Sequence, residues 1–252
     1  MNQAEKAARF AELHVKGCAV VAVQCVGCWL CEIDSGRGRK AIATSSWAVA
    51  EAQGYRDGEA IPVGLVEQIV ARVVGTIDAP VTVDFEGGYS DDDHVLAENV
   101  SRLLELGVIG INFEDRIVRG AGLYAIERQA RRIAAIHDAA RKKGVDLFIN
   151  ARTDLFLGQQ GDPAKSIGDA LDRVKAYAAA GASGFFVPGL RDDALIGRIC
   201  EDVALPVNVM VMDGVPPTER LSELGVARIS YGAIPYIRAM KALREEALKV
   251  LS

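Results

Sequence analysis

The sequence has no apolar run of the roughly 18 residues that a membrane-spanning helix needs, and no secretory signal opens it. It also has no surplus of basic residues: the net charge is −5, which disfavours a general nucleic-acid binder because such proteins must neutralise phosphates. Histidine is scarce, and we interpret His14, His94 and His137 as surface residues of helices because they show no metal-ligand spacing. We therefore expect a cytoplasmic protein without a membrane or nucleic-acid partner.

Cysteine is uncommon outside one short stretch. Of the five cysteines, Cys18, Cys25, Cys28 and Cys31 lie within fourteen residues, and Cys200 stands alone. The spacing of Cys25 and Cys28 is compatible with a zinc site or a redox pair. No second C-x-x-C and no pair of histidines completes a tetrahedral zinc site, so we do not favour either interpretation.

Short apolar runs alternate with amphipathic stretches along the chain, which is typical of parallel β-α-β units. The predicted strands are 41–44, 81–85, 110–113, 147–151, 184–187, 206–211 and 227–230. An eighth strand is expected between the opening helix, 2–14, and residue 41. The other predicted helices are 63–77, 91–106, 123–143, 164–180, 192–202, 217–224 and 234–251. Eight units in 252 residues predict an α/β fold, a (β/α)8 TIM barrel forming a single domain over residues 1–252. The rival is an open doubly wound sheet, but no G-x-G-x-x-G follows an early strand.

Carboxylates follow two neighbouring predicted strands at their C-terminal ends. Asp84 and Glu86 end one strand and Glu114 ends the next. Barrel enzymes place their chemistry at this end of the strands. Converging oxygen ligands suit Mg²⁺ or Mn²⁺ bound partly through water. The alternative is that one or more of these acids caps a helix or pairs with Arg152.

Two further strand ends carry groups that can hold an anion. Arg152 can clamp a carboxylate or phosphonate through two hydrogen bonds, or it can form a salt bridge at the rim. Ser45 and Ser46 begin a turn between a strand and a helix, where backbone N–H groups can bind an anion or the side chains can cap the helix.

Residues from about Lys40 to Ala247 resemble the isocitrate lyase/phosphoenolpyruvate mutase superfamily, in its phosphoenolpyruvate mutase-like branch. The stretches that carry the resemblance include IATSSWAVAEAQGYRDGEAIP, VTVDFEGGYSD, GINFEDR, LFINARTD, AYAAAGASGFFVPG and LGVARISYG. The resemblance implies a (β/α)8 barrel and Mg²⁺-dependent chemistry on small 2-oxo acids or related carboxylates. It also implies a homo-oligomer, a dimer or a tetramer.

The metal-site roles that the resemblance implies fall on four acids. Asp84 matches the direct metal ligand, while Glu86 and Glu114 match carboxylates that hold the metal, often through water. Asp57, within Gly54-Tyr55-Arg56-Asp57, matches an acid that approaches metal and substrate and is therefore a catalytic candidate.

Substrate binding is implied for four other residues. Ser45 and Ser46 match a turn that binds the substrate carboxylate. Arg152 matches an arginine that contacts the substrate and counts as a second catalytic candidate. Asn208 is expected to line the site.

The loop 115–123 departs from the well-defined activities of the superfamily. It has neither the cysteine of isocitrate and methylisocitrate lyases nor the Lys and Asn of phosphonopyruvate-using members. Three functions therefore stay open. The first is a carbon–carbon lyase or hydrolase acting on a 2-oxo acid or substituted dicarboxylate through an enolate-type intermediate. The second is a P–C bond enzyme of the phosphonomutase type. The third is an inactive barrel that binds a metal and a carboxylate.

Residues 18–39 do not fit the resemblance. A coding string for residues 23–39, read one nucleotide later, can be translated as YNVWDAGSARSTAAGDA, which matches the motif expected at this place. We therefore infer two compensating frameshifts, near Cys18 and near Lys40, which would place four of the five cysteines in the shifted window. Sequencing the gene across codons 17–41 tests this inference, because an unshifted frame there would rule out the frameshifts.

Overall fold

A ring of parallel strands forms the centre of the molecule. The computed structural model describes residues 1–252 except 23, 27–39, 159–161 and 252. The described strands, in their order around the sheet, are β1 (Val20–Ala22), β9 (Arg228–Ser230), β8 (Val207–Met210), β7 (Gly184–Phe186), β6 (Phe148–Arg152), β5 (Gly110–Glu114), β4 (Val81–Asp84), β3 (Ile42–Thr44) and β2 (Gln24–Cys25). All the neighbouring pairs are parallel.

The two shortest strands together occupy the place of the expected eighth strand. β1 pairs with β9, and β2 pairs with β3, on either side of residue 23. The ends of the sheet therefore meet, and the (β/α)8 barrel is confirmed. Cys25 is buried in β2, whereas Cys28, Cys31 and most of the suspected frameshifted stretch lie outside the described residues.

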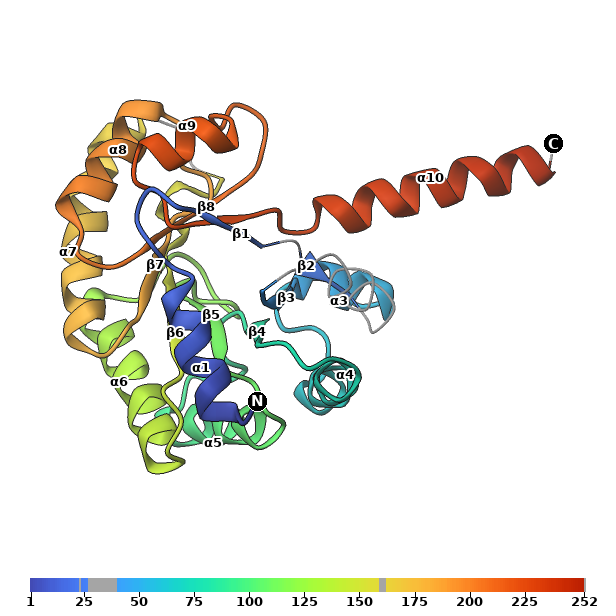
Figure 1. The fold of residues 1–252 in the computed structure, drawn as a ribbon, viewed down its shortest axis with the longest axis horizontal. Helices are drawn as coiled ribbons and strands as arrows, with labels where there is room; N and C mark the ends of the chain where they lie inside the picture. Colours follow the sequence, from blue (N-terminus) through green and yellow to red (C-terminus); the bar gives the residue numbers. More distant parts are fainter. Residues whose placement is uncertain (23, 27–39, 159–161, 252) are drawn as a thin grey trace.

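Helices surround the strands (Figure 1), and most begin and end within three residues of the predicted positions. They are α1 (Gln3–Glu12), α3 (Ser46–Ala52), α4 (Val63–Thr76), α5 (Asp93–Glu105), α6 (Ile126–Lys142), α7 (Ile167–Ala179), α8 (Asp193–Asp202), α9 (Thr218–Glu223) and α10 (Ile234–Leu251), with 3-10 turns η1 (Asp154–Phe156) and η2 (Pro163–Ser166). The sequence analysis did not predict α3, because seven residues are too few for a helical period to show.

The opening helix α1 packs against the N-terminal end of the barrel. The Phe10 ring lies 5.2 Å from the Phe148 ring, centroid to centroid, and the His14 ring stacks on Phe148 at 4.2 Å. His14 is only 8% exposed, so its interpretation as a surface residue was wrong. Burial lowers the pKa of His14 to about 3, and the charge of Arg228 acts in the same direction. The lack of metal-ligand spacing does not show whether a histidine is buried, and His14 is buried because its ring packs on Phe10 and Phe148.

The closing helix α10 differs from the others because it extends away from the barrel (Figure 1). None of its residues is buried, and its apolar Met240 and Leu243 are 40% and 62% exposed.

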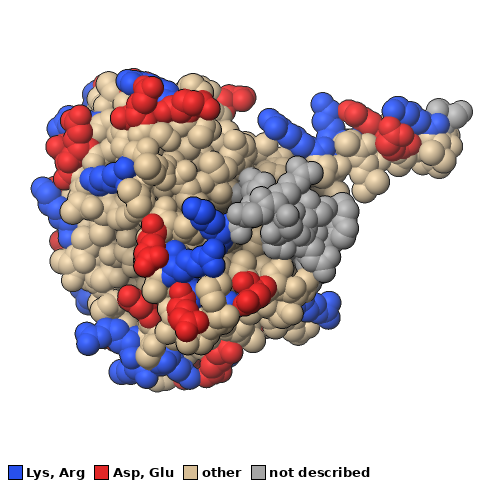
Figure 2. Space-filling model, in the orientation of Figure 1, with Lys and Arg blue, Asp and Glu red and all other residues tan. Residues whose placement is uncertain are grey.

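Figure 2 shows acidic and basic side chains interspersed over the face drawn. Within the described ranges, no helix combines the length and the hydropathy needed to cross a bilayer.

Candidate active site

A cavity of about 380 Å³ opens at the C-terminal ends of the strands. Its lining includes five of the residues predicted from the sequence, namely Ser45, Ser46, Asp57, Asp84 and Arg152. These residues come from β4, β6 and the segments that follow β3, and the barrel brings them together because parallel strands end at one face. The remaining three predicted residues, Glu86, Glu114 and Asn208, lie next to this group and are described below.

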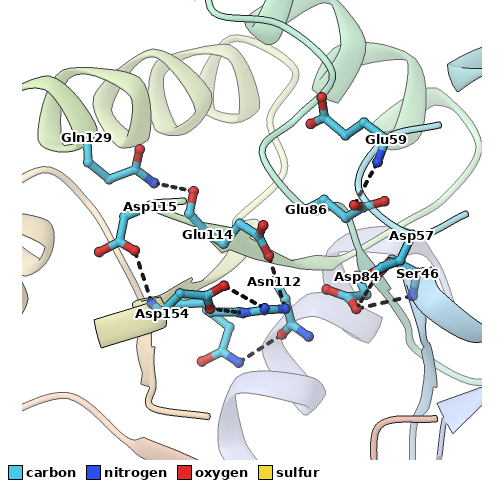
Figure 3. Close-up of polar contacts among 12 residues, drawn as sticks. Ser46, Asp57, Glu59, Asp84, Glu86, Asn112, Glu114, Asp115, Gln129 and Asp154 are labelled. Atoms are coloured by element: carbon cyan, nitrogen blue, oxygen red, sulfur yellow. Dashed lines mark hydrogen bonds and ion pairs between the residues drawn. The ribbon is translucent and has the colours of Figure 1, made fainter. Parts of the chain in front are cut away.

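Asp84 ends β4 and is held by the neighbouring segment (Figure 3). Its Oδ2 accepts hydrogen bonds from the backbone N–H of Ser46 at 3.1 Å and from Ser46 Oγ at 2.9 Å. Thr44 Oγ1 accepts a hydrogen bond from the Asp84 N–H at 3.0 Å. The other carboxylate oxygen of Asp84, Oδ1, is buried and has no hydrogen-bond partner. Because a buried carboxylate oxygen is costly to leave unpaired, Oδ1 is a natural ligand for a cation or water.

The two serines after β3 have different roles. Ser45 caps α3, since its side chain accepts a hydrogen bond from the Ala48 N–H at 3.4 Å. Ser46 directs both its N–H and its hydroxyl to Asp84, and its hydroxyl is also 3.5 Å from Asp57 Oδ1. Asp57 lies at the mouth of the cavity, where partial desolvation and the Asp84 charge raise its pKa. Ser46 therefore contacts two of the predicted acids, Asp84 and Asp57.

Glu86 lies in a group of three residues with unusual backbone geometry. Glu59, Glu86 and Tyr89 have φ values of 56°, 49° and 63°, in the left-handed region that non-glycine residues seldom adopt. They hold one another: the Glu59 N–H donates to Glu86 Oε2 at 2.9 Å, and the Tyr89 N–H donates to Glu59 Oε1 at 2.7 Å. Such conformations concentrate at functional sites. Sequence reasoning missed Glu59 and Tyr89 because neither ends a strand.

Burial is the main reason that the Glu86 carboxyl favours its protonated form. Glu86 is only 3% exposed, and the charges of Asp57 and Asp84 add to the effect of burial. The pKa of Glu86 therefore rises to about 8. Negative charge on Asp57 and Asp84 thus disfavours a further negative charge on Glu86. This arrangement gives a cation an electrostatic advantage there.

Glu114 and Arg152 form an ion pair at the ends of β5 and β6. Arg152 Nη1 lies 3.0 Å from Glu114 Oε2, and Arg152 also donates to both oxygens of Asp154, at 2.6 and 3.0 Å. Burial would lower the pKa of Arg152, but the two carboxylates raise it above its ordinary value. Burial raises the pKa of Glu114 well above its usual range, although Arg152 opposes the shift. The alternative in which an acid pairs with Arg152 therefore describes Glu114 in this structure.

A buried cluster supports Asp154 from beneath. Asp115 accepts hydrogen bonds from Arg173 Nη1, Tyr177 Oη and the Asp154 N–H, at 3.0, 3.0 and 3.1 Å. Asp115 is fully buried, and burial raises its pKa while hydrogen bonds and Arg173 oppose that rise. The cluster fixes the segment that orients Arg152. No spacing in the sequence links Arg173 and Tyr177 to the site.

The barrel interior below the cavity is polar. Asn150 Nδ2 donates to Asn112 Oδ1 at 2.8 Å, and Asn208 Oδ1 accepts from Ser230 Oγ at 3.2 Å. Arg228 is 1% exposed, and its three guanidinium nitrogens have no hydrogen-bond partner. Burial lowers its pKa to about 10, against the charge of Asp84. The predicted residue Asn208 thus lies within the barrel, on β8.

The donor set fits Mg²⁺ better than a metal that needs a complete protein cage. Within the residues that the structure describes, no three Asp, Glu, His or Cys side chains are already gathered to hold a metal. Mg²⁺ typically takes only one or two carboxylates and keeps several waters. Asp84, with its unpaired Oδ1, would hold such an ion directly, and Glu86 and Glu114 would reach it through water.

Comparison with known proteins gives matches over nearly the whole chain. Residues 10–251 match the family model for phosphoenolpyruvate phosphomutase. An uncharacterized protein of Mycobacterium tuberculosis is 33% identical over 214 residues, which cover 84% of this chain and 77% of that protein. Oxaloacetate decarboxylase of Pseudomonas savastanoi pv. phaseolicola is 28% identical over 194 residues, covering 72% of this chain and 63% of the enzyme.

Solved structures match over nearly the whole chain. A candidate phosphonomutase from Burkholderia cenocepacia J2315 is 40% identical, with a TM-score of 0.95, and the match covers 98% of this chain and 99% of that one. Phosphonopyruvate hydrolase in complex with oxalate and Mg²⁺ shares the fold, with a TM-score of 0.84 at 18% identity, over 99% of this chain and 87% of that one.

The raised pKa of Glu86 predicts how the stability of the metal-free protein depends on pH. Between pH 4.5 and about 8 the folded state holds a proton on Glu86 that the unfolded state releases, so the free energy of unfolding falls as pH rises through this window. The contribution is at most about 1.4 kcal/mol per pH unit. Glu86→Gln cannot titrate and should flatten the slope.

Urea denaturation in EDTA at pH 5 to 8 measures this slope. Glu127→Gln, at an exposed position on α6, is the matched control and should keep the wild-type slope. Equal slopes for wild type and Glu86→Gln would contradict the assignment of the raised pKa to Glu86.

Proposed function

The chain belongs to the phosphoenolpyruvate phosphomutase family, whose members are lyases and phosphonomutases, and we propose that it is a Mg²⁺-dependent carbon–carbon lyase or hydrolase. Its substrate is a small 2-oxo acid or substituted dicarboxylate, and the reaction passes through an enolate-type intermediate. The observation that carries the proposal is the unpaired, buried Oδ1 of Asp84 in a cavity that also contains Asp57 and Arg152. The resemblance of the motifs supports the same reaction class.

The residues of the chain divide the work of such a reaction. Bound Mg²⁺ supplies a Lewis acid that stabilises negative charge on a substrate oxygen. Arg152 attracts the substrate carboxylate into the cavity, and Ser46 orients Asp84 through two hydrogen bonds. Asp57, whose pKa is raised by partial desolvation and the Asp84 charge, holds a proton more readily than an ordinary aspartate and is the candidate acid at the mouth.

We propose that the loop 115–123, which packs beside Glu59 and Gly87 next to the cavity, limits the access of water to the reacting groups. Arg116 and Leu123 form an antiparallel bridge that closes the loop at its base. Val118 packs close to Gly87, where an added Cβ would approach its Cγ2 to 2.8 Å. Arg119 lies 3.9 Å from Glu59 at the edge of the site. Excluding water protects an enolate from premature protonation.

A phosphonomutase is the second candidate function. The 40% identity to the Burkholderia cenocepacia protein favours it. The composition of loop 115–123, without the Lys and Asn of phosphonopyruvate-using members, argues against it. An inactive barrel that binds metal and carboxylate is the third candidate.

Turnover of a substrate panel distinguishes the three functions. We expect pyruvate or oxalate to be released from oxaloacetate, an alkylmalate or methylisocitrate in the presence of Mg²⁺, and no release in EDTA or with Asp84→Ala. A phosphonate made or consumed from phosphonopyruvate would establish the second function instead. Mg²⁺ binding without turnover of any compound would establish the third.

Mg²⁺ should also stabilise the fold, because it binds only where the folded chain gathers the carboxylates. We expect millimolar Mg²⁺ or Mn²⁺ to raise the melting temperature. Asp84→Ala should abolish the rise, while Glu86→Ala should reduce it less, since a water can replace a carboxylate that holds the metal indirectly.

Differential scanning fluorimetry with and without Mg²⁺ measures the effect. Asp172→Ala, on the exposed face of α7, is the control and should keep the full rise. A full rise in Asp84→Ala would show that the metal binds elsewhere.

We also propose that the protein is a homo-oligomer in the cytoplasm, with α10 at the subunit interface. Exposed apolar side chains on a helix with no buried residue, among them Leu243, indicate a surface that another copy covers.

Light scattering at micromolar concentration should give a dimer or tetramer, and Leu243→Glu should shift the population towards monomer. Glu245→Gln, on the same helix and 58% exposed, is the control. A monomeric wild type would refute the proposal.

A further inference from the structure

The active-site cavity has two unlike sides. The groups that bind anions, protons or metal lie on β3, β4 and β6 and the segments that follow them. The wall at the ends of β7 and β8 consists of the apolar side chains Phe186 and Met210, and the polar Ser230 and Gln24 line the cavity on the strands beyond β8. Phe186 is only 3% exposed, and Met210, at the end of β8, is half-buried. The roles assigned above use only the polar side.

The cavity holds little positive charge for an anionic substrate. Arg152 is the one cationic side chain among the described residues that line it. Each of its three guanidinium nitrogens already contacts a protein carboxylate: Nη1 contacts Glu114, while Nε and Nη2 contact Asp154. One substrate carboxylate can share this arginine and a metal. A second would meet no further cationic side chain among the described residues that line the cavity.

The apolar side begins directly beside the arginine. The Phe186 ring centroid lies 6.0 Å from Arg152 Cζ. Met210 packs over Gly232, where an added Cβ would come within 3.2 Å of the Met210 Sδ. A ligand whose carboxylate lies at Arg152 therefore extends along Phe186 and Met210. A carboxylate placed against these two side chains would lose hydration without gaining a charged partner from them, which is unfavourable.

The size of the cavity also exceeds that of the smallest 2-oxo acids. Its volume of about 380 Å³ corresponds to on the order of ten water-sized groups at about 30 Å³ each. Pyruvate would leave the apolar side in contact with water. A branched alkyl or aryl substituent would cover that side, and a methionine adapts readily to such shapes.

We propose that the substrate is a monocarboxylic 2-oxo acid with a branched alkyl or aryl substituent, which binds against Phe186 and Met210. The inference rests on the proposed function and narrows its substrate from small carboxylates in general to this class. Met210 is then a residue that determines specificity, because it provides the apolar contact at the end of β8 without touching the polar side's acids.

Ligand binding tests the proposal without requiring turnover. The probes are 4-methyl-2-oxopentanoate, 2-oxoglutarate of similar size, and pyruvate, each titrated calorimetrically into the wild-type protein in Mg²⁺ buffer. We expect 4-methyl-2-oxopentanoate to bind about tenfold more tightly than either of the others, the effect expected for burying its branched end. Equal or tighter binding of 2-oxoglutarate would overturn the inference and leave the proposed function intact. Failure of all three to bind would overturn the inference, and the proposed function would fail with it only if the substrate panel described above also gave no turnover.

Variants of Met210 locate the contact. Met210→Ala should weaken 4-methyl-2-oxopentanoate about tenfold and leave pyruvate unchanged. Met210→Lys should reverse the preference towards 2-oxoglutarate. Met212→Ala, at a half-buried methionine two residues further on, is the matched control and should bind as wild type.

Melting temperatures of all variants show whether each remains folded. If a Met210 variant does not fold, Met210→Leu keeps the apolar contact and the wild-type ranking of the three ligands still decides the proposal. Unchanged ligand ranking in folded Met210→Ala and Met210→Lys would contradict the placement of the substituent at Met210.

Discussion

The crowding of carboxylates around one arginine is the constraint on which the site depends. Glu114 and Asp154 both contact Arg152, within 3.0 Å, and Asp84 and Glu86 lie close enough to raise the pKa of Glu114 further. So much buried negative charge disfavours the compact state unless it is neutralised by protons or cations. The fold tolerates it because a barrel has a rigid layer of strands beneath the rim, whose pairing does not depend on these side chains.

Neutralisation comes from several directions. Arg152 acts from the side, and Arg228 acts from within the barrel, where its charge interacts with Asp84. Its guanidinium has no hydrogen-bond partner in the barrel, so ordered water is the natural way to satisfy it. Protons on Glu86 supply part of the remaining balance at neutral pH. A divalent cation bound here would displace the Glu86 proton, so metal binding would depend on pH and would change stability.

Sequence reasoning predicted the barrel and the rim acids because both have strong local signals. Alternating apolar strands and amphipathic helices reveal the repeat, and Asp84, Glu86 and Glu114 follow strands directly. The same reasoning could not predict contacts between distant segments. Glu59 joins Glu86 through a backbone N–H, and Asp115 meets Arg173 across 58 residues of chain. His14 was wrongly predicted to lie at the surface. Its burial depends on where α1 packs, which helical periodicity does not specify.

The division of the cavity into two sides follows from the same geometry. Strands β4, β5 and β6 end in charged residues, whereas β7 and β8 end in Phe186 and Met210. The apolar side lowers the local polarity around Arg152 and the acids, and a charge that develops on a substrate there is stabilised more strongly by fixed groups than it would be in water. An apolar substrate substituent would complete this environment by excluding water from Phe186 and Met210. Specificity and catalysis would then depend on the same physical effect, because the substituent that the protein recognises would also exclude water from the site.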